Sequence, residues 1–294
     1  MKLLIALLGR LPLRVRVALG RFLGSVFSYV PTRERRIAEL QMRLFLKEHY
    51  SPDLIRRLYA GLGQTLMECI NLTPILSRLE QFVETEDSEI IRSVISEKRP
   101  IVTLTGHLGN WDLLAAYIIA SGIAVTTIGR EARSHSLQAI LADIRATYGI
   151  KTIWRSNSSG VKEIVSDLKS GRVVAALIDQ DTDVSSSLIP FFGVPVRCPS
   201  GLVAIGKKMD AIITTAFITR GSDSRYKVHV KRLDAEKSIE EILHEYHIEL
   251  EKHIRHHPEQ WVWIHKRWRT LPDGERLSSK RYINYLTERL QSES

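Results

Sequence analysis

His107 and Asp112 are the first residues of this chain whose types and spacing indicate chemistry. A neutral imidazole can take a proton from a hydroxyl group, and a carboxylate beside it can orient the ring and stabilise the imidazolium that forms. Glycines at Gly106 and Gly109 flank the histidine and let the backbone bend sharply and approach a ligand. The pattern predicts a general base held by an acidic partner.

The residues around His107 predict a strand, a turn and a helix in that order. The apolar run at residues 101–104 is typical of a buried strand, and the apolar residues from Trp111 onward are typical of a helix. Asn110 stands at the N-cap position and places Asp112 in the first helical turn, where the helix dipole favours its ionised form. His107 then lies on the turn and is free to fold back onto Asp112. The alternative is a polar turn and helix cap without a catalytic role.

The same spacing occurs twice more, at His229/Asp234 and at His244/Glu249. The second pair lies within a predicted helix, where five residues turn the chain by about 500°, so the two side chains point to different faces. We interpret both pairs as surface residues.

A second polar group, Asp179-Gln180-Asp181, follows the predicted strand at residues 172–178. Reactive groups of open α/β sheets gather at the carboxyl ends of strands, so this group is expected near His107. A metal site is the weaker interpretation, because no histidine or further carboxylate stands nearby in sequence. We expect polar support of the active site, and neither a metal nor another cofactor.

Two further segments have alternative interpretations. Arg145 ends a predicted helix at residues 134–148, where an arginine is usually a dipole partner or a solvated charge, but it could also face the site and stabilise negative charge. The apolar loop at residues 188–196, which contains Phe192, is either core packing, a lid, or a contact for an acyl chain or membrane.

Strand and helix patterns alternate along most of the chain. Near-continuous apolar strands between helices predict an α/β fold with a largely parallel, mixed sheet covered by helices on both faces. Two helices are expected over residues 31–73, divided near Ser51-Pro52. We expect strands at residues 80–85, 101–104, 124–128, 151–154, 172–178, 211–219 and 226–230, and further helices at residues 88–98, 134–148, 160–169, 202–208 and 238–256.

The first 60 residues carry most of the charge. They hold twelve Lys or Arg and four Asp or Glu, a net +8 of the total of +9, and no acidic residue precedes Glu34. Arginines interrupt every apolar stretch well short of the roughly 20 residues that a spanning helix needs. We expect residues 1–30 to form a basic amphipathic segment at a membrane interface, and residues 31–294 to form one α/β domain. The alternative is a terminal helix packed on the protein's own core.

Two other features bound the class of protein. Cys69 and Cys198 are far apart and show no metal-ligand spacing, which favours a reducing, cytoplasmic setting. Residues 258–269 place three of the five tryptophans among basic residues. That pattern suits stacking on nucleotides, a membrane interface or a phosphosugar, whereas the alternation of Trp261 and Trp263 is typical of core residues of a strand.

Four ordered motifs, which span nearly the whole chain, resemble those of the bacterial lipid A late acyltransferases. They are His107-Leu108-Gly109-Asn110-Trp111-Asp112, Asp179-Gln180, Phe192-Gly193-Val194-Pro195, and Pro258-Glu259-Gln260-Trp261-Val262-Trp263 with His265 and Arg267-Trp268. The family resembles glycerolipid acyltransferases in its H-x4-D/E motif. Many members carry glutamate where this chain has Asp112.

The resemblance implies transfer of a fatty acyl chain from acyl carrier protein to a hydroxyl of a lipid A precursor, at the cytoplasmic face of the bacterial inner membrane. His107 is then the base, oriented by Asp112, while Arg145 or backbone N–H groups near Gly109 stabilise the oxyanion. The expected substrate-binding residues are Gly109, Asn110, Trp111, Asp179, Gln180, Phe192 and Arg267. Related enzymes acylate other glycolipids, such as mannosylated phosphatidylinositol. The alternative within the enzyme class is an acyltransferase that acts on another glycolipid or on a lysophospholipid.

Two non-enzymatic classes compete with this interpretation. A peripheral nucleic-acid-binding protein would explain the basic charge and the tryptophans, but not the glycine-flanked turn at His107, so we expect no nucleic acid partner. A membrane scaffold would explain only the start of the chain.

Overall fold

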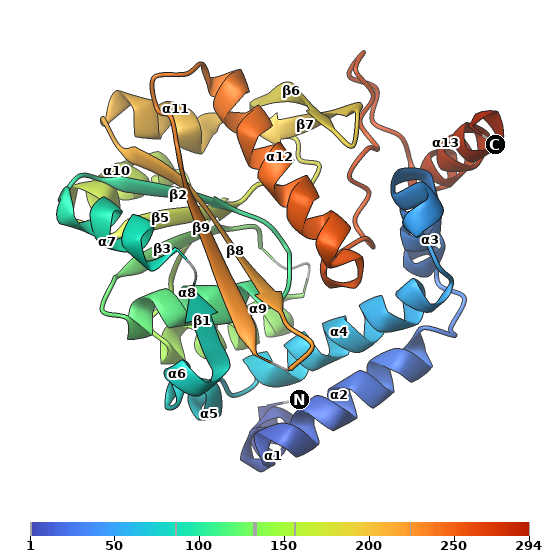
Figure 1. Cartoon of the computed structure of the whole chain (residues 1–294), viewed down its shortest axis with the longest axis horizontal. Helices are drawn as coiled ribbons and strands as arrows, with labels where there is room; N and C mark the ends of the chain where they lie inside the picture. Colours follow the sequence, from blue (N-terminus) through green and yellow to red (C-terminus); the bar gives the residue numbers. More distant parts are fainter. Residues whose placement is uncertain (1, 86, 132–133, 156, 224, 294) are drawn as a thin grey trace.

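The computed structural model describes residues 2–85, 87–131, 134–155, 157–223 and 225–293, and its centre is a seven-stranded sheet (Figure 1). The strand order is β1-β9-β8-β2-β5-β3-β4. Among the described strands of this sheet only the β8–β9 pair is antiparallel, so β1 and β9 run opposite to the other five strands. The strands are β1 Val83–Thr85, β2 Ile101–Thr105, β3 Val125–Gly129, β4 Lys151–Trp154, β5 Val173–Leu177, β8 Ile212–Arg220 and β9 Tyr226–Leu233. This confirms the predicted α/β class with a largely parallel sheet.

Helices cover both faces of the sheet, and the central strands β2, β5 and β8 carry buried residues on both sides. Val102 and Leu104 of β2 belong to one core with residues of α10, α11 and α12, whereas Ala216 of β8 packs in a second core with α8. The helices around the sheet are α5 Thr73–Leu76, α6 Leu79–Phe82, α7 Ser88–Ser96, α8 Trp111–Ala120, α9 His135–Thr147, α10 Gly160–Lys169, α11 Gly201–Lys208 and α12 Ile239–His256.

The N-terminal helices lie together along one edge of the molecule, with α2 alongside α4 (Figure 1). These are α1 Lys2–Arg10, α2 Leu13–Phe27, α3 Arg33–Leu46, the 3₁₀ turn η1 Lys47–His49 and α4 Asp53–Cys69. The backbones of α2 and α4 approach very closely, since a Cβ atom built on Gly20 would lie 2.4 Å from the Gly63 carbonyl oxygen. This contact fixes α2 against the rest of the domain. The two helices predicted over residues 31–73 are α3 and α4, and the break between them includes Ser51-Pro52, as expected.

The C-terminal part of the chain returns to these helices. After the 3₁₀ turn η2 Pro258–Gln260, an irregular segment leads to α13 Ser279–Ser292, which packs beside α3 (Figure 1). Trp261 and Trp263 are buried, as core residues would be, but they do not form a strand.

The apolar stretch at residues 188–196 is a β-hairpin, not the predicted loop. Strands β6 Ser186–Phe191 and β7 Val194–Pro199 pair antiparallel as a two-stranded sheet. Phe192 and Gly193 connect them with φ angles of 49° and 74°. Two consecutive positive φ angles are typical of a two-residue hairpin turn. A Phe-Gly pair predicts such a turn less strongly than Asn-Gly does. The prediction at residues 80–85 was also partly wrong, because α6 precedes a strand of three residues.

Within the described ranges, no helix is both long enough and apolar enough to span a bilayer.

Candidate active site

His107 follows β2 and is hydrogen-bonded to Asp179, which follows the neighbouring strand β5. Its Nδ1 is 2.8 Å from Asp179 Oδ1, and its backbone N–H donates to Asp179 Oδ2, also at 2.8 Å. A carboxylate at Nδ1 holds the ring in the tautomer that carries its proton there, so Nε2 keeps the lone pair that can accept a proton. The sequence predicted Asp179 as polar support, and the structure makes it the direct partner of the histidine.

Asp179 is buried, with 1% of its side chain exposed. It accepts a third hydrogen bond, from Trp261 Nε1 at 2.8 Å. Burial by itself would raise the pKa of this carboxyl group, but the charge of His107 and the hydrogen bonds from His107 and Trp261 outweigh burial and hold the pKa well below its usual range. Asp179 is therefore ionised at neutral pH and can stabilise an imidazolium.

Gln180 links His107 to a second histidine, His265. Its amide nitrogen is 3.1 and 3.0 Å from the two ring nitrogens of His107 and 2.6 Å from His265 Nε2. Burial and the charge of His107 lower the pKa of His265 to about 4, so His265 is neutral and accepts the amide proton. This contact fixes the amide of Gln180 against the reactive ring.

Asp112 does not hold the His107 ring, which differs from the prediction. Its Oδ1 accepts a hydrogen bond from Arg145 Nε at 2.8 Å, and each of the two side chains is 18% exposed. The hydrogen bonds described for the imidazole ring come from the residues after β5. The reason lies in the first turn of α8, where the Trp111 ring packs edge-on to His107 at 4.9 Å and the Asp112 carboxylate pairs instead with Arg145 of α9.

Gly109 and Asn110 stabilise the turn after His107, and neither lines the cavity that opens beside this histidine. Gly109 has a φ angle of 62°, and a Cβ atom there would lie 2.2 Å from the carbonyl oxygen of Ile218. Its N–H donates to Gln260 O at 3.0 Å, so it is not free for an oxyanion, contrary to one expectation. Asn110 is fully buried, caps α8 and donates to Glu68 Oε2 at 2.9 Å.

A cavity of about 530 Å³ opens beside His107. Trp111, Asp112, Arg145 and Gln180 line it. Its remaining wall is mainly apolar and crosses the carboxyl ends of β5, β3 and β4. The apolar lining residues include Ile128, Trp154, Val161, Ile164, Ala176, Leu202 and Ile205.

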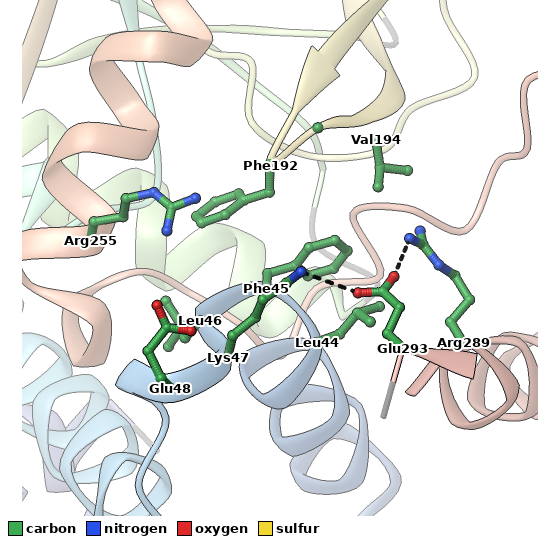
Figure 2. Close-up of a pocket in the computed structure, with 11 residues that line it drawn as sticks. Leu44, Phe45, Leu46, Lys47, Glu48, Phe192, Val194, Arg255, Arg289 and Glu293 are labelled. Carbon is green, nitrogen blue, oxygen red and sulfur yellow. Dashed lines mark hydrogen bonds and ion pairs between the residues drawn. The ribbon is translucent and has the colours of Figure 1, made fainter. Parts of the chain in front are cut away.

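Phe192 and Arg267 lie elsewhere. Figure 2 shows Phe192 in a second cavity, of about 300 Å³, where the Arg255 guanidinium lies 4.8 Å from the centre of its ring. Arg267 is 1% exposed and donates to Arg197 O at 2.6 Å and to His247 Nε2 at 3.0 Å. We assign both residues to packing the hairpin and the C-terminal segment, in place of the substrate contacts predicted for them.

Sequence reasoning missed the site role of His265 and the whole apolar wall. His265 stood within the Trp-rich motif, which was the available signal, whereas the wall gathers single residues from several elements and has no local signature. The described part of the chain contains no group of His, Cys, Asp and Glu side chains that could hold a metal ion.

The fold and the site define an α/β enzyme with a histidine–aspartate pair beside an apolar cavity. The chain belongs to the bacterial lipid A biosynthesis acyltransferase family, whose sequence profile it matches over residues 2–270. The resemblance drawn from the four motifs is thereby confirmed. Family membership makes the protein an acyltransferase.

Individual relatives are distant, and two of the three that follow are similar over most of their length. A lipid A biosynthesis acyltransferase of Haemophilus influenzae is 23% identical over 283 residues, which is 92% of this chain and 87% of the relative. A lipid A biosynthesis palmitoleoyltransferase of Escherichia coli is 24% identical over 279 residues, 90% of this chain and 89% of the relative. A phosphatidylinositol mannoside acyltransferase of Mycobacterium tuberculosis is 22% identical over 165 residues, 55% of this chain and 52% of the relative.

Proposed function

We propose that the protein transfers a fatty acyl chain from acyl carrier protein to a hydroxyl group of a lipid A precursor, with His107 as general base. The observation that carries this proposal is the 2.8 Å contact between His107 Nδ1 and the ionised Asp179, at the edge of a largely apolar cavity. A thioester, an alcohol and a hydrocarbon chain are the three chemical groups that such a site suits.

The reaction follows from the tautomer of His107. Its Nε2 takes the proton from the acceptor hydroxyl as the oxygen attacks the thioester carbonyl carbon, and the Asp179 carboxylate stabilises the imidazolium. The tetrahedral intermediate collapses with loss of the C–S bond, and the imidazolium returns the proton to the leaving thiolate. The products are an ester and the free thiol of the carrier, and no acyl-enzyme is required.

Arg145 and Gln180 are the groups that we assign to the oxyanion. Arg145 bonds to Asp112 through Nε, which leaves its terminal nitrogens for a negatively charged oxygen in the cavity. Asp112 thereby acts as a positioning residue, because it fixes the guanidinium and not the imidazole. The amide of Gln180, 3.0 Å from His107 Nε2, lies beside the nitrogen at which the proton moves.

The apolar wall suits the acyl chain. From the end of β2, where His107 lies, to Trp154 at the end of the edge strand β4, the cavity crosses three strand spacings, or roughly 14 Å. An acyl chain placed along this wall would put its thioester next to His107 and its methyl end near Trp154.

The N-terminal helices suit the cytoplasmic face of the bacterial inner membrane. Large apolar side chains of α1 and α2 are exposed, among them Leu4 at 60% and Phe22 at 64%, and they lie among arginines with no acidic residue before Glu34. Apolar insertion combined with attraction to anionic headgroups is how interfacial helices bind. The same positive charge suits an acidic carrier protein.

The direct test is transfer of labelled acyl chain from acyl carrier protein to a lipid A precursor in detergent, comparing wild type, His107→Ala and His244→Ala. His244 is an exposed histidine of α12 and serves as the matched control. We expect transfer by the wild type and the control, and loss of transfer in His107→Ala. Near-wild-type transfer by His107→Ala would refute the role of the base, and no transfer by folded wild type would refute the donor or acceptor.

The second candidate acceptor is another glycolipid, with the same chemistry at His107. The M. tuberculosis relative, named as a phosphatidylinositol mannoside acyltransferase, matches over about half of this chain and favours this alternative. Running the same assay with mannosylated phosphatidylinositol and with a lysophospholipid separates the acceptors.

A further inference from the structure

Four arginines, Arg130, Arg155, Arg269 and Arg276, lie near one another around the polar segment that follows β5. Arg130 follows β3 and Arg155 follows β4, so both stand at the same edge of the sheet as His107, and both line the cavity. Arg269 and Arg276 come from the irregular segment before α13 and reach the polar group that follows β5. We call these four residues the arginine cluster.

The acidic side chains nearby are already engaged by part of the cluster. Asp181, with a side chain only 3% exposed, accepts a hydrogen bond from Arg276 Nε at 3.0 Å, and Arg269 Nε lies 3.7 Å from the same oxygen. Asp183 pairs with Arg155 at 3.3 Å. Glu131, which lines the cavity, is a third carboxylate near the cluster. The four guanidinium groups therefore exceed the carboxylates of Asp181, Asp183 and Glu131 by one charge.

Arg130 and Thr182 have unused binding capacity. Within the described ranges, Arg130 is exposed and forms no ion pair, although it stands close enough to Arg269 for their positive charges to interact. Thr182 lines the cavity, and its hydroxyl oxygen is buried without a hydrogen-bond partner. Arg269 Nε is also buried without such a partner. Unpaired buried polar atoms are costly, and an oxygen of a ligand in the cavity would satisfy the Thr182 hydroxyl.

From this geometry we propose that the arginine cluster binds a phosphate group of a substrate while that substrate's reacting end lies at His107. Arginine matches the oxygens of phosphate through paired, charge-assisted hydrogen bonds. A cavity that is apolar along β5, β3 and β4 and basic at Arg130 and Arg155 suits a molecule with a hydrocarbon chain and a phosphate. The inference rests on the proposed function and adds the group by which the substrate is held.

Two substrates of the proposed reaction can supply this phosphate. One is the phosphorylated sugar of the acceptor, and the other is the phosphodiester of the carrier's pantetheine arm. Steady-state kinetics with Arg130→Gln and Arg155→Gln distinguish the two sources of phosphate. Each substrate is used with and without its phosphate. The acceptor without phosphate is a dephosphorylated precursor, and the donor without phosphate is acyl-pantetheine in place of acyl carrier protein. Arg232→Gln is the matched control, since Arg232 pairs with Glu97 at the opposite, amino end of β2.

We expect each cluster variant to raise KM for the phosphate-bearing substrate by about tenfold or more, the loss typical of a hydrogen bond to a charged group, with little change in kcat. The rise should vanish when that same substrate lacks phosphate, and Arg232→Gln should behave as wild type. A rise confined to the acceptor assigns the site to the sugar phosphate, and a rise confined to the donor assigns it to the carrier arm. An unchanged KM, or an equal rise with and without phosphate, overturns the proposal.

A binding measurement keeps this result separate from the proposed function. Trp111 and Trp154 line the cavity, so tryptophan fluorescence can follow a titration with inorganic phosphate. If the wild type transfers no acyl chain, saturable quenching that is lost in the Arg130→Gln/Arg155→Gln double variant still supports a phosphate site. Absence of saturable quenching in a wild type that also shows no transfer overturns both.

Discussion

His107 and Asp179 each stand two residues beyond a register pair of adjacent parallel strands, Thr105 of β2 and Leu177 of β5. Because parallel strands in register end at the same edge of the sheet, strand pairing itself brings the imidazole and the carboxylate to 2.8 Å. The H-x4-D spacing serves a different contact, since Asp112 binds Arg145. The site therefore contains two separate carboxylates with two separate partners.

Asp179→Asn should lower kcat by on the order of 10³-fold or more while KM changes little, because an amide neither holds the required tautomer nor stabilises the imidazolium. Acyl transfer at saturating substrate measures the effect, and circular dichroism checks the fold. Asp234→Asn, at an exposed aspartate, is the control. Near-normal turnover of the folded Asp179→Asn protein would show that the contact is structural.

The sequence indicated the fold well because its signals are local. The strand, turn and helix around His107 follow from an apolar run, two glycines and the Asn110 cap, and all three appear as β2, the turn and α8. The partner of His107 was not predictable in this way. Asp179 is 72 residues away, and no local pattern states that β5 lies next to β2.

Two other incorrect predictions have the same cause, because they too concern contacts that tertiary structure sets. The turn at Phe192 and Gly193 depends on two positive φ angles in a stretch whose composition is that of an apolar loop. Arg267 stands in a basic, aromatic motif that resembles a ligand contact, yet it is buried because the irregular segment around it packs against α12 and the hairpin. Tertiary packing decides these positions, and a single sequence does not specify it.

Trp154→Ala should shift acyl selectivity toward longer chains. Trp154 lies across Gly129, where a Cβ atom would be 2.9 Å from its ring, and both residues line the cavity at the edge-strand end. Removing the indole lengthens the cavity at the β4 end, so it can hold a longer acyl chain. One methylene in an apolar pocket changes kcat/KM by roughly 10- to 200-fold. Competition between acyl carrier proteins of different chain length measures the shift. Gly129→Ala should displace the ring and move selectivity the other way, and an unchanged chain-length profile in both variants would place the methyl end elsewhere.

The stability of the protein should fall as the pH drops from about 6.5 toward 3. Burial, together with the charge of Arg267, lowers the pKa of His247 to about 3, and burial likewise lowers the pKa of His253 to about 3. Because both folded-state pKa values lie below the unfolded value of about 6.5, the unfolded chain binds more protons in this window, and each histidine contributes a slope of about 1.4 kcal/mol per pH unit.

Guanidinium unfolding at several pH values tests this slope. His247→Gln should reduce by about one the number of protons that the unfolded chain binds in excess of the folded protein, so the unfolding free energy should depend less steeply on pH. His244→Gln, at an exposed position of the same helix, should leave this slope as in wild type. An identical slope in wild type and His247→Gln would contradict the assignment.

Phe22→Asp should weaken binding to vesicles of phosphatidylethanolamine and phosphatidylglycerol by tenfold or more, since burying a phenylalanine side chain contributes about 1.5–3 kcal/mol. Phe22 is 64% exposed on α2, and Ile95, 43% exposed on α7, provides the control Ile95→Asp. Co-sedimentation at two salt concentrations measures both the apolar and the electrostatic part. Equal losses in the two variants would mean that the N-terminal helices are not the membrane-binding surface.

Gly20→Ala and Gly24→Ala should each lower the thermal midpoint, although alanine normally stabilises a helix by about 1 kcal/mol relative to glycine. A Cβ atom at Gly24 would lie 2.0 Å from the carbonyl oxygen of Tyr59, and one at Gly20 would lie 2.4 Å from that of Gly63, so α2 must move away from α4. Overpacking of this kind costs typically 1–3 kcal/mol and outweighs the gain in helix propensity. Gly9→Ala is the matched control, since its nearest neighbour would be an ordinary 3.5 Å away, and it should be neutral or stabilising. A midpoint for Gly24→Ala as high as that of Gly9→Ala would show that α2 docks loosely, and the apolar face of α1 and α2 would then not be held in a fixed position relative to His107.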